Sequence, residues 1–141
     1  MLKKNIILLP FGTNKKGNYF DLNNINIYGD DDYKFYGQIE HPKTNDVYLL
    51  KSVSHMITNV SVDNFAVYGD VKVLDTESGL LLKELIDADL VVFRPRIIIE
   101  NNVANIYTFD AISRYEDIYY DNIILRYKKL KKINGRITKN D

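Results

Sequence analysis

The segment 52–73 constrains the fold of this chain more than any other part of the sequence. Residues 52–62 are rich in β-branched side chains, and residues 65–73 alternate between apolar and polar side chains, which is typical of a half-buried strand. Asp63 and Asn64 lie between the two segments and favour a two-residue turn. The sequence therefore predicts a β-hairpin near the middle of the chain.

Further strands are predicted on both sides of this hairpin, at residues 6–11, 25–28, 33–40, 90–99 and 103–109, with a last ordered element at 123–127. Residues 14–18 have the composition of a turn. Segment 90–99 contains Arg94-Pro95-Arg96, and we expect these residues to interrupt the strand because proline lacks a backbone donor.

One short helix is predicted at residues 78–86. Asp75 or Thr76 would cap its first turn by accepting a hydrogen bond from a free backbone N–H group. Its predicted apolar face consists of four side chains: Leu81, Leu82, Leu85 and Ile86. Leu85 is expected in the core, where its truncation to alanine would cost about 2–5 kcal/mol.

The order of these elements, several strands, one helix and then more strands, indicates an all-β or β-dominated α+β fold. The chain has 141 residues, 45% of them hydrophobic, which fits one globular domain. We expect that domain to span residues 1–125, followed by a basic C-terminal tail at 126–141. Deleting the residues after Gly135 should hardly change the melting temperature. These patterns alone favour neither a barrel nor a sandwich.

Composition excludes several kinds of site. The chain has no cysteine, so it forms no disulfide and no cysteine metal site. His41 and His55 have no accompanying zinc-ligand pattern, and we expect no metal and no cofactor. No apolar run is long enough for a transmembrane helix, so no membrane partner is expected.

Three blocks of the sequence, in order and spacing, resemble the prohead (capsid-maturation) proteases of tailed bacteriophages. The blocks are residues 36–42 (YGQIEHP), residues 53–59 (VSHMITN), and residues 68–79 (YGDVKVLDTESG) followed by 82–87 (LKELID). The resemblance covers about residues 36–96. It implies a small herpesvirus-protease-like β-barrel with one short peripheral helix, and a catalytic role for the histidine that precedes proline, His41.

The same resemblance places the catalytic serine on the strand after the helix. In this chain that stretch is residues 90–96 (LVVFRPR), which contains no serine, threonine or cysteine. Ser54 adjoins His55 on a strand, where neighbouring side chains point to opposite faces. Ser113 lies well downstream, beyond a turn and another strand. We therefore expect no serine hydroxyl within roughly 3.5 Å of either imidazole in the geometry that a general base needs.

These observations favour a structural protein of the virion over an enzyme. The expected protein is an auxiliary or decoration subunit that binds the major capsid protein, assembled into the capsid in the host cytoplasm. Basic residues are the candidate partner-binding groups, for an acidic surface: Arg94, Arg96, Lys128, Lys129, Lys131 and Lys132.

Two alternatives stay open at this point. One is an active prohead maturation serine protease that cleaves scaffold and capsid proteins, with His41 or His55 as catalytic residues. The other is a core protein that contacts nucleic acid through the basic tail, although the chain as a whole is electrically neutral, with 19 basic and 19 acidic residues.

Overall fold

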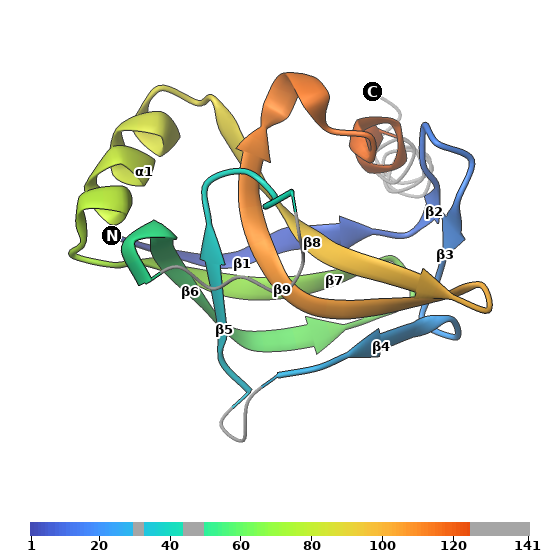
Figure 1. The fold of residues 1–141 in the computed structure, drawn as a ribbon. Coiled ribbons are helices and arrows are strands. Elements are labelled where there is room, and N and C mark those ends of the chain that lie inside the picture. The colour runs from blue at the N-terminus through green and yellow to red at the C-terminus, as the bar shows by residue number, and fades with distance from the viewer. Residues whose placement is uncertain (30–32, 44–49, 125–141) are drawn as a thin grey trace, which may run out of the picture.

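The computed structural model describes residues 1–29, 33–43 and 50–124 (Figure 1). In chain order its elements are β1 (Leu2–Pro10), β2 (Gly12–Thr13), β3 (Tyr19–Phe20), β4 (Ile25–Ile27), β5 (Phe35–Gln38), the 3-10 helix η1 (Leu50–Ser52), β6 (Val53–Val62), β7 (Ala66–Val73), α1 (Glu77–Asp87), β8 (Val91–Glu100), β9 (Val103–Ser113) and the 3-10 helix η2 (Arg114–Glu116). The β-dominated α+β class is confirmed.

The first sheet has the strand order β1-β7-β6-β5 and is antiparallel throughout. Its centre is the β6–β7 hairpin that the sequence predicts. The carboxylate of Asp63 accepts hydrogen bonds from the backbone N–H groups of Phe65 (2.8 Å) and Ala66 (2.9 Å), which fixes the turn. The predicted turn at residues 14–18 is also present, between β2 and β3, which form a small two-stranded sheet beside the main one.

The second sheet has the order β4-β9-β8. β8 and β9 form a long antiparallel hairpin, and its turn residues Asn101 and Asn102 both have positive φ, which asparagine tolerates better than most residues. The expected interruption at Arg94-Pro95-Arg96 is wrong. β8 runs continuously through these residues because both arginines are neutralised by carboxylates, and proline is compatible with the edge position of β8.

The two sheets meet along β5 and β9. Ile39 forms one isolated parallel bridge with Ala111, and the other links at this seam come from side chains. Thr108 donates to the carbonyl oxygen of Tyr36 across the same seam, at 2.5 Å. The two larger sheets are therefore joined by a discontinuous seam in the described residues, and a closed barrel stays a prediction.

The core lies between the sheets and beneath α1. It contains Leu8, Leu9, Phe20, Phe35, Ile57, Val67, Val71, Val73, Leu82, Phe93, Ala104, Ile106, Phe109, Ala111 and Tyr119. Phe35 and Phe109 meet edge to face, with ring centroids 5.3 Å apart, directly at the seam.

Helix α1 is capped as the sequence predicts, since Thr76 accepts a hydrogen bond from the backbone N–H of Gly79 at 2.9 Å. Its predicted apolar face is partly wrong. Leu82 is fully buried, Leu85 is half-buried rather than a core residue, and Leu81 is 55% exposed. Leu81 lies about 100° around the helix from Leu82, so it leaves the buried stripe.

Two predictions about the C-terminus reach beyond the described residues. The basic tail at 126–141 and its lysines Lys128, Lys129, Lys131 and Lys132 lie outside them, as does most of the predicted element 123–127. The described part ends with a helical segment over residues 120–124.

Candidate functional site

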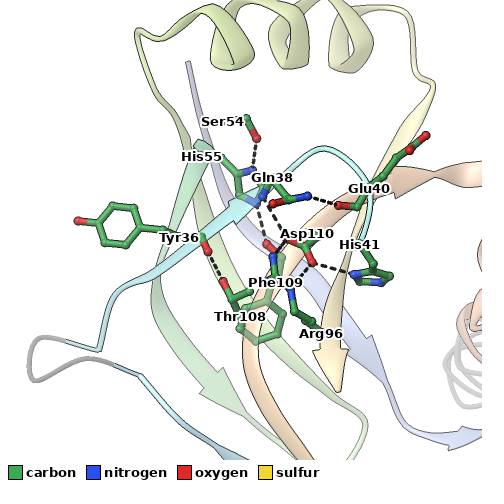
Figure 2. A network of polar contacts seen from close by, with 10 residues as sticks. All are labelled: Tyr36, Gln38, Glu40, His41, Ser54, His55, Arg96, Thr108, Phe109 and Asp110. Atoms are coloured by element: carbon green, nitrogen blue, oxygen red, sulfur yellow. Dashed lines mark hydrogen bonds and ion pairs between the residues drawn. The ribbon is translucent and has the colours of Figure 1, made fainter. Parts of the chain in front are cut away.

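The carboxylate of Asp110 is the centre of the polar network drawn in Figure 2. Asp110 lies on β9 with a fully buried side chain, and Arg96 of β8 binds it through two hydrogen bonds, Nε–Oδ2 and Nη2–Oδ1, each of 2.8 Å. His41 Nδ1 lies 2.7 Å from Oδ2, and the backbone N–H of Gln38 donates to Oδ1 at 3.0 Å. One carboxylate thus connects β8, β9 and the end of β5.

These contacts determine the ionisation of Asp110. Burial by itself would raise the pKa of the carboxyl group. Hydrogen bonds from His41 and Arg96, together with the charge of Arg96, outweigh burial and hold the pKa of Asp110 below its ordinary value. Asp110 is therefore a carboxylate at neutral pH and faces a permanently charged guanidinium group.

His41 is positioned by the backbone that follows β5. Glu40 has a positive φ of 66°, an uncommon conformation for a residue with a side chain, and its N–H donates to the carbonyl oxygen of Ala111 at 2.6 Å. This geometry turns the next residue, His41, toward Asp110. Nδ1 donates to the carboxylate, which leaves Nε2 for a ligand, and 39% of the His41 side chain is exposed.

His41 borders a pocket of about 630 Å³. Its lining comes from the β2–β3 hairpin, from the turn at Glu40 and His41, from β8, and from the end of β9 with the chain that follows it. The polar lining residues include Asn14, Lys16, Asn18, Glu40, Ser113 and Glu116, and the apolar ones include Phe20, Ile97, Ile99 and Ile112. A base that is oriented by a carboxylate therefore faces a mixed polar and apolar cavity.

The strand that the resemblance assigns to the nucleophile is β8, and its arginines have internal roles. Arg94 makes a buried bidentate ion pair with Asp117, both contacts being 2.9 Å, and also donates to the carbonyl oxygen of Ile7. Arg96 holds Asp110 as described above. Arg94 and Arg96 are 2% and 5% exposed, so their guanidinium groups connect parts of this chain rather than presenting charge to a partner.

The second histidine contradicts one prediction from the sequence. Ser54 Oγ lies 2.8 Å from His55 Nδ1, although neighbouring residues on a regular strand point to opposite faces. The reason is a β-bulge: the β5–β6 ladder pairs Gly37 with His55 and Gln38 with Val53, so Ser54 is an extra residue on β6. The expectation that no serine hydroxyl approaches an imidazole is therefore wrong for His55.

Ser54 and His55 are as close as a catalytic serine and histidine, but a substrate cannot reach them because both side chains are buried. His55 Nε2 donates to the carbonyl oxygen of Phe109 at 2.7 Å, so Nδ1 must accept from the hydroxyl of Ser54. Both residues are fully buried, and burial lowers the pKa of His55, which favours the neutral ring. The ring nitrogens of His55 and the hydroxyl of Ser54 are therefore hydrogen-bonded inside the core.

Sequence reasoning named His41 as a candidate catalytic residue. The contact between His41 and Asp110 was missed because 69 positions separate them in the sequence. Asp117 was missed entirely, since an aspartate between a strand and the next element is typical of a solvated turn.

Two further kinds of feature were sought in the described part of the chain, a metal-binding cluster and a membrane-spanning helix. It contains no group of three or more histidine, cysteine, aspartate or glutamate residues that could hold a metal ion. Within the same residues, no helix is both long enough and apolar enough to cross a membrane.

Comparison of this chain with protein-family models, with curated proteins and with solved structures finds no match.

Proposed function

We propose that this chain is a structural protein of a bacteriophage virion, built on the fold of a prohead protease, that binds the major capsid protein without cleaving it. The single observation that carries the proposal is the ion pair of Arg96 with Asp110. A base and its orienting carboxylate are present in His41 and Asp110, but on the strand after the helix Arg96 binds that carboxylate and no nucleophile is available.

The arrangement of the elements supports the assignment of the fold. The three sequence blocks that carry the resemblance fall on β5 with the turn after it, on β6, and on β7 with α1. β4 and β5 both lie along β9, while Arg94 links β8 to β1 by donating to the carbonyl oxygen of Ile7. A six-stranded barrel in the order β1-β7-β6-β5-β9-β8 is therefore our proposal for the complete architecture.

Auxiliary binding is also consistent with the pocket at His41. A cavity of about 630 Å³ with polar walls and apolar lining groups has the size and composition of a protein's ligand site. The pocket could hold a segment of the capsid protein. Because β8 has Arg96 and no nucleophile beside this pocket, the bound segment would not be cleaved.

The experiment mixes the purified protein with freshly assembled capsid protein and measures co-sedimentation and the length of the capsid chain. We expect the wild type and His41→Ala both to co-sediment and neither to shorten the capsid chain. Leu81→Ala, which changes an exposed residue of α1, is the matched control for folding and should bind equally. Failure of the wild type to co-sediment would overturn the proposal.

One observation favours a second candidate, an active maturation protease. Ser113 lines the same pocket as His41, and within the described residues its Oγ accepts a long hydrogen bond, 3.3 Å, from the backbone N–H of Tyr115. If Ser113 served as the nucleophile, the wild type would cleave capsid or scaffold chains and His41→Ala would abolish that cleavage.

A further inference from the structure

The pocket at His41 has more acidic than basic groups to offer a ligand. Among the described residues, its ionisable lining side chains are Lys16, Glu40, His41, Arg94, Arg96 and Glu116. The two arginines are neutralised by the buried carboxylates that they bind, so they contribute no free charge. Two acidic side chains and one lysine remain, which leaves the lining with one negative charge when the histidine is neutral. This balance favours a positively charged ligand.

His41 adds a hydrogen-bond acceptor to this lining. Its Nδ1 donates to the carboxylate of Asp110, as Figure 2 shows, so in the neutral ring Nε2 carries the lone pair. Arg96 binds the same carboxylate and keeps it ionised, which fixes this tautomer. Nε2 has no hydrogen-bond partner among the described residues. A neutral His41 therefore selects a ligand that donates, such as an ammonium or guanidinium group.

The apolar part of the lining suits the stem of a basic side chain. It consists of one phenylalanine and four isoleucines: Phe20, Ile97, Ile99, Ile112 and Ile118. Ile99 is 46% exposed, so apolar surface is open to a ligand. Lysine and arginine bury their methylene groups on such surface and keep the charged end beside polar groups. A small cation without a stem, or an uncharged apolar side chain, would use only part of this lining.

We propose that the pocket at His41 binds a lysine or arginine side chain of the partner protein, with its methylene groups on the isoleucines and its charge beside Glu40, Glu116 and Nε2 of His41. The inference rests on the proposed function, in which this pocket holds a segment of the capsid protein, and it specifies a residue that the segment must contain. It also reverses the expectation from the sequence, which gave basic residues of this chain an acidic partner.

The test titrates a capped pentapeptide, acetyl-Gly-Ala-Lys-Ala-Gly-amide, into the isotope-labelled full chain and follows the imidazole resonances. The chain has two histidines, so His41 reports on the pocket and the buried His55 is the internal reference. We expect the resonances of His41 to shift and those of His55 to stay constant. A peptide with norleucine in place of lysine keeps the methylene groups without the charge and should bind at least about tenfold more weakly.

Substitutions in the chain identify the groups that bind the charge. Glu40→Gln combined with Glu116→Gln should weaken binding of the lysine peptide at least about tenfold. The matched control is Glu77→Gln combined with Glu84→Gln, which removes the same charge from exposed positions of α1 outside the pocket and should leave the affinity unchanged. Lys16→Met should strengthen binding about threefold, because it removes a competing positive charge, and a misfolded protein would not bind more tightly.

The proposal is overturned if the lysine peptide leaves the His41 resonances unchanged at about 1 mM, if the norleucine peptide binds equally well, or if the two double variants bind alike. The capsid assay separates this inference from the proposed function. If the lysine peptide binds but the wild type does not co-sediment with capsid protein, the proposed function fails and the preference for a basic side chain stands. If Glu40→Gln combined with Glu116→Gln co-sediments as the wild type does, this inference fails and capsid binding stands.

Discussion

Replacing Asp110 by alanine is expected to lower the free energy of unfolding by about 3–5 kcal/mol. The substitution leaves the guanidinium group of Arg96 buried without its carboxylate and removes the bonds to His41 and to the backbone of Gln38. Breaking one side of a buried ion pair is costly because the remaining charge has neither a partner nor water. Urea denaturation monitored by circular dichroism measures the loss.

The matched control is Asp89→Ala. Asp89 also pairs with an arginine, Arg114, at 2.9 Å, but its side chain is 83% exposed. An exposed pair contributes about 0–1 kcal/mol. Alanine at the positive φ of Asp89, 56°, adds up to about 1 kcal/mol, so this variant should lose clearly less stability than Asp110→Ala. Equal losses for Asp89→Ala and Asp110→Ala would contradict the central role given to the buried carboxylate.

Asp110 also makes the stability of the fold depend on pH in a known direction. Because the pKa of Asp110 is lowered in the folded chain, its charge stabilises the fold at pH values above the ordinary value of 3.8. That stabilisation is lost as the pH falls through the lower pKa of the folded state. The difference in stability between the wild type and Asp110→Asn should therefore be constant near neutrality and shrink below about pH 4.

Gly37→Ala is expected to cost about 3–5 kcal/mol, which combines overpacking of the core with the loss of a buried hydrogen bond. A methyl group at Gly37 would overlap the carbonyl oxygen of Phe109 and Nε2 of His55. Those two atoms bond to each other at 2.7 Å, so the methyl group would part them and open the seam between β5 and β9. Thermal unfolding followed by calorimetry measures the effect.

Gly17→Ala separates this steric effect from the general cost of replacing glycine. Gly17 has nothing within 4 Å of the added methyl group, but its φ of 84° disfavours alanine, which should cost about 1 kcal/mol. If the melting temperature of Gly37→Ala is no lower than that of Gly17→Ala, the contact between β5 and β9 does not contribute the expected stability.

Local patterns in the sequence predicted the elements whose causes are local. The hairpin of β6 and β7 follows from alternation and from the turn at Asp63, and the start of α1 follows from the cap at Thr76. The bounds of α1 were predicted closely, and the error at Leu81 concerns only which face of the helix packs against the sheet. That orientation depends on packing against β6 and β7, which no pattern within the helix specifies.

The failures arise where distant residues decide the outcome. β8 continues through Arg94 and Arg96 because Asp117 and Asp110 neutralise them, and these carboxylates lie 23 and 14 positions away. The contact of Ser54 with His55 depends on a bulge opposite Gln38, which is a property of the pairing and not of either strand. Ion pairs and register are tertiary features, so the composition of one segment cannot reveal them.

In the proposed function, His41 and Asp110 have no nucleophile to activate. The most direct measurement is the intact mass of the purified full chain after incubation with a serine-directed fluorophosphonate, with an active serine hydrolase treated in parallel. We predict an unchanged mass, because the strand after α1 presents Arg94 and Arg96 and because Ser54 is fully buried. An adduct on Ser113 that disappears in His41→Ala would contradict the account and identify the protein as a hydrolase.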